Sequence, residues 1–384
     1  MFWKKKRTYL DAASGVSGNS SSPHYEGRKA KRMLEDARTD IARLIEVQPD
    51  DTIFTSGATE ANALAILGHV RALRLLAGHD AVGRNNMHVL YLPSAHASIV
   101  ENMNILAAEG VVVEPLPIRE CRIDTEALTK LLRNETVLVS MDAVCGETGV
   151  VWNTHEVSEV LKKARGDGVA ARILLHVDAS QAPLTEKMTR AHFGADMLTF
   201  DASKVGAVRG IGALIAHRTI PLTPLFKGGG QERGLRPGSE APELAQRFAA
   251  ALRVAARDRE LFRASAEQER MRLVAAIKKT IPNVLVNEAR IQTPNILNLS
   301  LSGRDTDYLV ALLDEDGFAV STRSACETDS EEGSRAVLAL FGDGSRAKST
   351  LRISWGPSVR PSELANFARA LVRTVAFIDN SGQG

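Results

Sequence analysis

The segment Leu174–Leu214, LLHVDASQAPLTEKMTRAHFGADMLTFDASKVGAVRGIGAL, contains most of two short apolar runs. These runs, Ile173–Val177 and Met197–Phe200, are bounded by polar or small residues, which is typical of buried strands in a mainly parallel sheet. Asp178 follows the first run and Lys204 lies shortly after the second. Because ligands of open α/β sheets bind beyond the carboxyl ends of the strands, we expect both side chains to face one crevice.

An acid and a lysine in one crevice match the chemistry of pyridoxal phosphate. The lysine amine can form a Schiff base with the aldehyde of this cofactor, and the carboxylate can keep the pyridine nitrogen protonated. Each residue also has an ordinary interpretation, since an aspartate after a strand often caps a helix and a loop lysine is often only solvated. The pair therefore predicts a cofactor site only together with the rest of the chain.

The composition limits the class of protein. At 384 residues the chain has room for two domains, and 44% hydrophobic with 24% charged residues is typical of a soluble globular protein. The net charge of +2 indicates neither a nucleic-acid nor a membrane partner. There is no apolar run long enough to span a membrane, and the basic start Lys4–Arg7 is not followed by a signal-peptide core. The odd, sparse set of Cys121, Cys145 and Cys326 predicts a reducing, cytoplasmic location.

Strands alternate with helices from about residue 50 to 215, which predicts a doubly wound, mainly parallel sheet. Between a strand and a helix, the turn Ser56–Thr59 offers backbone N–H groups that suit a phosphate, although it is also ordinary helix-capping chemistry. His96 follows the strand expected at His88–Leu92 and can face the crevice. A lone histidine is more often a packing or surface residue, and no spaced partners indicate a metal.

The second half of the chain begins with a glycine-rich loop, Gly228–Ser239, to which we assign a functional role. A long helix at Ala241–Ile281 leads into a smaller α+β domain of about residues 283–384. Its expected strands are Ile296–Leu301, Phe318–Ser321 and Thr350–Ser354. Cys326 lies in a polar stretch, which predicts an exposed loop and a candidate nucleophile, whereas the other two cysteines are expected to pack in the interior.

Seven motifs, in order along the chain, carry a resemblance to a known family. They are TSGATEANALAI (55–66), SAH (94–96), HVDASQ (176–181), SKVGAVRGIGAL (203–214), GGGQERGLRPGS (228–239), RSAC (323–326) and LRISWG (351–356). From about Tyr9 to Val359 the chain resembles the cysteine desulfurases, pyridoxal-phosphate enzymes of the class V aminotransferase group.

The resemblance implies the α/β fold of PLP-transferase fold type I. This fold has a large domain with a mainly parallel seven-stranded sheet and a smaller α+β domain. The implied division assigns residues 16–250 to the large cofactor-binding domain. Residues 1–15 and 251–384 then form the small domain, which carries the loop of the catalytic cysteine.

The resemblance also implies a set of cofactor contacts. Lys204 would form the Schiff base, Asp178 would bind the pyridine nitrogen, His96 would stack on the ring and Gln181 would bind the ring hydroxyl. The phosphate contacts would come from the helix N-terminus and from a neighbouring subunit, which implies a homodimer. They are Ala58, Thr59 and Ser239, the last acting in the site of the neighbouring subunit.

The implied reaction converts L-cysteine to L-alanine. Arg352 would bind the substrate carboxylate, and Cys326 would take the sulfur as a persulfide and donate it to an iron–sulfur scaffold or another sulfur acceptor. Two alternatives stay open. One is a selenocysteine lyase or another class V aminotransferase-like enzyme that does not need Cys326, and the other is a catalytically inactive binding partner on the same fold.

The chain departs from the family pattern at four places. A helix of the family between its first strand and the Gly18-Asn19 segment is missing, Asn-Asn-Glu is replaced by Cys145-Gly146-Glu147, and Arg-Ser-Gly by Arg236-Pro237-Gly238. The fourth is Asp201, which stands where the family places a phosphate-binding serine.

Because a carboxylate repels a phosphate, we expect Asp201 to turn away. Its expected partners are backbone N–H groups or a cation, Arg209 or Arg236, while Ser203 supplies the lost hydroxyl. The alternative is a shifted loop in which Asp201 is simply solvated.

Overall fold

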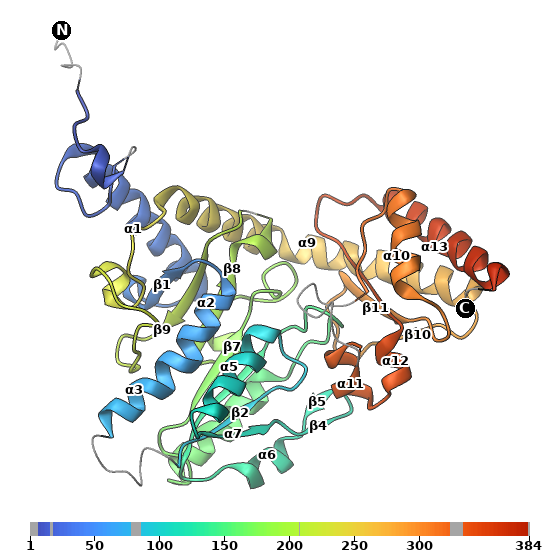
Figure 1. Cartoon of the computed structure of the whole chain (residues 1–384), viewed down its shortest axis with the longest axis horizontal. Helices are drawn as coiled ribbons and strands as arrows, with labels where there is room; N and C mark the ends of the chain where they lie inside the picture. The colour runs from blue at the N-terminus through green and yellow to red at the C-terminus, as the bar shows by residue number, and fades with distance from the viewer. Residues whose placement is uncertain (1–6, 16–17, 78–85, 207, 323–332, 383–384) are drawn as a thin grey trace.

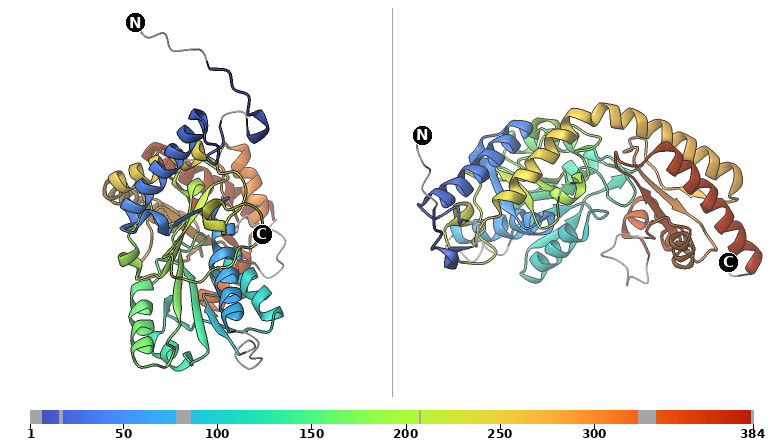
Figure 2. Two further views of the ribbon diagram at one scale, coloured as in Figure 1. Left: turned by 90° about the vertical axis from the view of Figure 1, so that its left-hand side faces the viewer. Right: turned by 90° about the horizontal axis from the view of Figure 1, so that it is seen from above.

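The computed structural model describes residues 7–15, 18–77, 86–206, 208–322 and 333–382. It consists of a large and a small lobe connected by one long helix, α9 (Pro242–Thr280) (Figure 1). The two lobes lie side by side along this helix (Figure 2).

The large lobe is built on a seven-stranded sheet of order β1-β9-β8-β7-β6-β2-β3. Five neighbouring strands run parallel to one another, in the order β3, β2, β6, β7 and β8. Strand β9 is antiparallel to both of its neighbours, β8 and β1. The strands are β1 Thr52–Thr55, β2 His88–Tyr91, β3 Val112–Pro115, β6 Thr136–Asp142, β7 Leu174–Asp178, β8 Met197–Asp201 and β9 Gly212–Ala216. The prediction of a mainly parallel, seven-stranded sheet is therefore confirmed.

The helices of the large lobe supply the apolar faces that cover this sheet. Helix α2 contacts β8 and β9, α5 contacts β2 and β3, α7 contacts β7, and α1 packs along α9. The described helices are α1 Tyr25–Ile45, α2 Ala58–Ala63, α3 His69–Leu76, α5 Ala97–Ala108, α6 Thr125–Leu131, α7 Thr154–Gly166 and α8 Arg190–Phe193. A π-helical segment, Leu64–Gly68, joins α2 to α3, and the hairpin β4 (Ile118–Arg119) and β5 (Arg122–Ile123) precedes α6.

The small lobe has its own antiparallel sheet, β10-β11-β12. Its elements are β10 Leu285–Val286, β11 Ile296–Ser300, β12 Thr350–Ser354, α10 Thr306–Glu315, α11 Arg335–Phe341, α12 Gly344–Lys348 and α13 Pro361–Ser381. The expected α+β character is thus confirmed.

The prediction of a strand at Phe318–Ser321 is wrong. The N–H of Phe318 donates to Leu313 O (2.8 Å) and the N–H of Gly317 donates to Asp314 O (2.9 Å), which closes the C-terminus of α10. Only Ser321 pairs with β12, in an isolated bridge to Arg352.

Helix α9 takes part in two separate hydrophobic cores. Phe248 and Leu252 belong to the core of the large lobe, and Leu273 and Ile277 to that of the small lobe. The proposed domain boundary near residue 250 falls inside this helix and stays a prediction. Residues 7–15, which that division groups with the small domain, contact the start of α1 instead, through Arg7 Nε to Glu26 Oε1 (2.9 Å) and related bonds. Among the described residues, no helix combines the length and apolarity needed to span a membrane.

Candidate active site

Asp178 and Lys204 lie at the carboxyl ends of two neighbouring parallel strands, as the sequence predicts. Asp178 is the last residue of β7, and Lys204 lies in the short 3-10 helix Ala202–Val205 directly after β8, the parallel neighbour of β7. Lys204, Gln181 and Ser203 line a cavity of about 280 Å³ together with Arg352, which comes from β12 of the small lobe. Among the described lining residues, each lobe therefore contributes one ionisable group to the cavity.

A chain of hydrogen bonds orients the carboxylate of Asp178. Asp178 is buried; its Oδ2 accepts from Asn62 Nδ2 (2.7 Å) and its Oδ1 accepts from the N–H of Ser180 (2.9 Å). Asn62 Nδ2 also donates to Ser98 Oγ (2.8 Å), which lies 2.8 Å from His96 Nδ1. Hydrogen bonds to both of its oxygens therefore hold the Asp178 carboxylate in one orientation.

Sequence reasoning missed Asn62. It is fully buried in α2, four residues after Ala58. A strongly polar amide between two alanines of that helix is the signal that points to it, because buried amides need hydrogen-bond partners.

His96 is the N-cap of α5, where its Nδ1 accepts from the N–H of Ser98 (3.2 Å). Its side chain is exposed and joins the network that ends at Asp178. The structure thus places His96 beside the site, and its stacking on a cofactor ring stays a prediction.

The position of Asp201 differs from the expectation. Its Oδ2 accepts from the N–H of Ala58 (3.0 Å), and its Oδ1 accepts from the N–H (2.7 Å) and the hydroxyl (2.6 Å) of Ser203. The expected pairing with backbone N–H groups is confirmed. The expectation that the carboxylate turns away is wrong, since it binds the N–H of Ala58, one of the three residues assigned to the phosphate. Thr59 is exposed next to it.

Arg236 does not pair with Asp201. Its Nε donates to Glu60 Oε1 (3.3 Å), while Glu60 Oε2 accepts from the N–H of Ser56 (2.6 Å). Ser239 Oγ accepts from Asn19 Nδ2 (3.4 Å), in the segment ahead of α1. The glycine-rich loop therefore contacts the start of α2 and the start of α1 within one chain.

The substitution at Gly146 makes room for Gln181. A Cβ atom at position 146 would lie 3.0 Å from Gln181 Nε2, closer than ordinary packing allows. Gly146 also accepts a hydrogen bond at its carbonyl from Arg352 Nη1 (3.2 Å). The glycine thus lets the Gln181 amide and the Arg352 guanidinium approach one short segment of backbone.

The buried cysteines are poor nucleophiles. Burial raises the pKa of Cys145 to about 12, and burial likewise raises the pKa of Cys121. Their thiols therefore stay protonated near neutral pH. Cys326, the residue expected to attack the substrate, lies outside the described residues.

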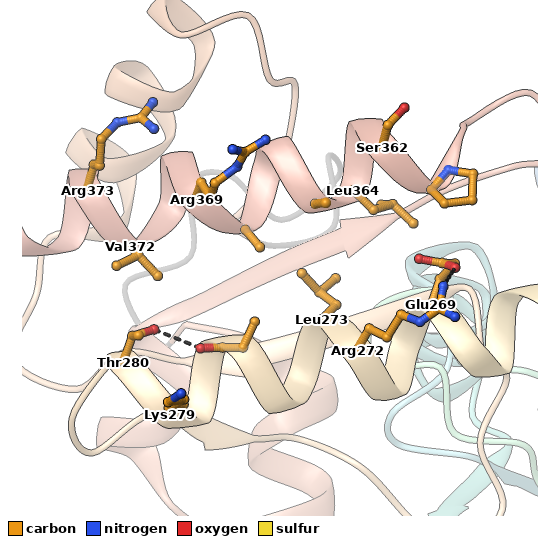
Figure 3. Close-up of a pocket in the computed structure, with 14 residues that line it drawn as sticks. Glu269, Arg272, Leu273, Lys279, Thr280, Ser362, Leu364, Arg369, Val372 and Arg373 are labelled. Carbon is orange, nitrogen blue, oxygen red and sulfur yellow. Dashed lines mark hydrogen bonds and ion pairs between the residues drawn. The ribbon is translucent and has the colours of Figure 1, made fainter.

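A larger hollow of about 970 Å³ lies away from the sheet, between α9 and α13. Figure 3 shows Leu273 of α9 and Leu364 of α13 on its two sides, with Arg369 and Arg373 along α13. Its lining comes from α9 and α13, whereas Gln181, Ser203 and Lys204, which follow β7 and β8, line the smaller cavity. The smaller cavity is therefore the candidate active site. In the described ranges, no group of three or more His, Cys, Asp or Glu side chains could hold a metal ion.

The chain is similar to known proteins of one family. The family model described as Aminotransferase class-V matches residues 5–367. Cysteine desulfurase IscS 1 of Archaeoglobus fulgidus is 31% identical over 340 residues, which cover 88% of this chain and 85% of the relative. The mitosomal cysteine desulfurase of Encephalitozoon cuniculi is 32% identical over 94% of this chain and 81% of its own length.

Two solved structures are also similar to the chain. A NifS-like protein has a TM-score of 0.83 at 26% identity and covers 95% of this chain and 93% of its own. DndA from Streptomyces lividans has a TM-score of 0.72 at 32% identity and covers 91% and 94%, respectively. The chain therefore belongs to the class-V aminotransferase family and, within it, to the cysteine desulfurases.

Proposed function

We propose that the chain is a pyridoxal-phosphate-dependent cysteine desulfurase that converts L-cysteine to L-alanine and leaves a persulfide on Cys326. The observation that carries the proposal is the cavity of about 280 Å³ in which Lys204 and Gln181 of the large lobe face Arg352 of the small lobe. A lysine, a planar amide and a guanidinium supply the groups that a carbonyl cofactor and an amino acid need.

Residues that line the cavity, and others at the end of β7 and the starts of α2 and α5, fit the cofactor. Asp178 would hold the ring nitrogen, Gln181 the ring hydroxyl and His96 the ring face, while the N–H groups of Ala58 and Thr59 would serve the phosphate. The fixed, buried carboxylate of Asp178 is the feature that such a ring requires. When bound, the cofactor supplies an electron sink for the electron pair left after removal of a Cα proton.

The residues of the chain would then divide the remaining work. Arg352 would bind the substrate carboxylate, and Lys204 Nζ would take the Cα proton and return a proton to carbon. The Cys326 thiolate would attack the substrate sulfur. An S–S bond forms as the Cβ–S bond breaks, and the electron pair of the broken bond stays with carbon. Because the pKa of both described cysteines is raised, Cys326 is the thiol best suited to this attack.

The test measures alanine and sulfide released from L-cysteine in the presence of a thiol reductant. Lys204→Ala should abolish both products, and Cys326→Ser should abolish them while pyridoxal phosphate still binds. Cys121→Ser is the matched control and should retain activity, since its thiol is buried and protonated. Unchanged turnover in Cys326→Ser would favour a selenocysteine lyase or a related enzyme, and no product from the unmodified chain would favour an inactive binding partner.

We further propose a homodimer in which Ser239 serves the phosphate of the neighbouring subunit. The proposal rests on the family resemblance; in its own chain the hydroxyl of this serine accepts a hydrogen bond from Asn19. Sedimentation equilibrium with and without cofactor tests this proposal, and a monomer that retains the cofactor tightly would contradict it. The persulfide would pass to an iron–sulfur scaffold or another sulfur acceptor, and a cytoplasmic location stays a prediction.

A further inference from the structure

We propose that Asp201 is an internal anion that occupies the phosphate-binding N–H group of Ala58 and competes with the cofactor phosphate for it. The inference rests on the proposed function, because it concerns how this chain binds the same cofactor. In this proposal, Asp201 lowers the affinity of the site for ligands that carry a phosphate.

The carboxylate makes contacts of the kind that a phosphate makes. Asp201 Oδ2 accepts from the N–H of Ala58 at 3.0 Å, and Oδ1 accepts from the N–H and the hydroxyl of Ser203 at 2.7 Å and 2.6 Å. The serine hydroxyl and the backbone N–H at the start of α2 are the donors expected to bind the phosphate. In this arrangement both are used by Asp201.

Close backbone packing holds the two partners together. Asp201 pairs with Gly212 in the β8–β9 ladder, and a Cβ atom on Gly212 would lie only 2.7 Å from the carbonyl carbon of Gly57. Since Gly57 directly precedes Ala58, the turn is fixed against the end of β8. Ala58 N and Asp201 Oδ2 are 3.0 Å apart, which leaves no space for a phosphate oxygen between them. A phosphate that binds the N–H of Ala58 must therefore displace the carboxylate.

The charge of Asp201 strengthens the competition. Among the described residues, its hydrogen bonds come from neutral groups of Ala58 and Ser203. In the same turn Glu60 lies 3.3 Å from Arg236 Nε, so that second carboxylate has a cationic partner. A phosphate that binds here therefore meets a carboxylate whose hydrogen-bond donors do not neutralise it.

The penalty should fall on the phosphate and not on the ring. Like charges about 4 Å apart repel strongly enough, near a protein surface, to weaken binding by about tenfold or more. Pyridoxal, which carries the same ring and aldehyde without the phosphate, should not feel Asp201. This difference separates an effect on the phosphate from a general disturbance of the site.

The experiment titrates wild type, Asp201→Asn and Asp201→Ser with pyridoxal phosphate, pyridoxal and inorganic phosphate, using visible absorbance and calorimetry. The Asp201→Asn change keeps an oxygen that can accept from Ser203 but removes the charge. Asp167→Ser, which changes an exposed aspartate at the C-cap of α7, is the matched control. Thermal midpoints of all variants check that the fold is retained.

Both Asp201 variants should bind pyridoxal phosphate and inorganic phosphate about tenfold more tightly than wild type, with unchanged affinity for pyridoxal. Unchanged phosphate affinity, or an equal change for pyridoxal, would overturn the inference. If neither pyridoxal phosphate nor pyridoxal binds to any variant, the proposed function fails. The inorganic phosphate titration then still decides the role of Asp201, because tighter binding in the variants supports it and equal binding overturns it.

Discussion

The pair Arg38–Glu232 covers the open edge of the large sheet. Among the described strands, β1 is the outermost of this sheet and pairs with β9 alone. On its other side, Arg38 Nη1 donates to Thr52 O (2.6 Å) and Glu232 Oε2 accepts from the N–H of Phe54 (2.8 Å). The two side chains bind each other through two bonds of 2.8 and 2.7 Å. They therefore replace the hydrogen bonds of a missing neighbour strand.

Removal of Glu232 should be strongly destabilising. The side chains of Arg38 and Glu232 are only 10% and 1% exposed, so the pair is buried. Burial works against the charge of Arg38, but the contact with Glu232 holds its pKa above the ordinary value. Loss of one partner from a buried ion pair costs about 3–5 kcal/mol. Because Glu35 Oε2 also lies 3.2 Å from Arg38 Nε, we expect Glu232→Ala to cost about 3 kcal/mol, the lower end of that range.

The measurement is urea unfolding followed by far-UV circular dichroism. Glu35→Ala, which removes a half-exposed partner of the same arginine, should cost less than about 1 kcal/mol. The double variant Arg38→Met with Glu232→Leu should be more stable than Glu232→Ala, since it buries no unpaired charge. A cost below about 1 kcal/mol for Glu232→Ala would refute the reasoning, and so would a double variant as unstable as the sum of its single changes.

Two further predictions concern the strand that carries Asp178. Asn62→Ala should destabilise the chain by about 1.5–3 kcal/mol in thermal or urea unfolding, because the carboxylate of Asp178 loses a hydrogen bond. Ser98→Ala keeps that bond and should cost less free energy of unfolding. A larger cost for Ser98→Ala than for Asn62→Ala would contradict the network. Burial lowers the pKa of His176 from 6.5 to about 4, so the folded chain keeps this ring neutral while the unfolded chain protonates near pH 6.5. Stability should therefore fall as the pH drops from about 7.5 to about 5, by roughly 2 kcal/mol more in wild type than in His176→Gln, and equal slopes would disprove the assignment.

The sequence predicted the strands that place the acid and the lysine because these strands are short, continuous apolar runs. The expected runs Ile173–Val177 and Met197–Phe200 agree with β7 and β8 to within one residue. A buried parallel strand needs apolar residues on both faces, so the pattern identifies the strand and its polar end together. In the small lobe, the short runs Ile296–Leu301 and Thr350–Ser354 likewise predicted β11 and β12, whereas at Phe318 the helix cap of α10 determines the backbone.

Contacts between segments far apart in the chain could not be predicted from local pattern. Asn62 and Asp178 are 116 residues apart, and Ala58 and Asp201 are 143 apart. Whether the carboxylate of Asp201 turns from the helix or binds to it depends on how closely β9 approaches Gly57, which no periodicity encodes. Electrostatic reasoning correctly predicted that Asp201 needs N–H donors, but it could not identify which N–H groups lie within reach.

The segment that follows β6 explains why the site tolerates its unusual residues. Three consecutive backbone carbonyls of this segment accept hydrogen bonds from three side chains of residues 292–352. These contacts are Gly146 O with Arg352 Nη1 (3.2 Å), Glu147 O with Asn298 Nδ2 (3.2 Å) and Thr148 O with Gln292 Nε2. Because the acceptors are main-chain atoms, replacement of the family's amides by Cys145 and Gly146 leaves them in place. The small lobe is thus attached beside the cavity through backbone, and the position of Arg352 opposite Lys204 does not depend on the substituted side chains.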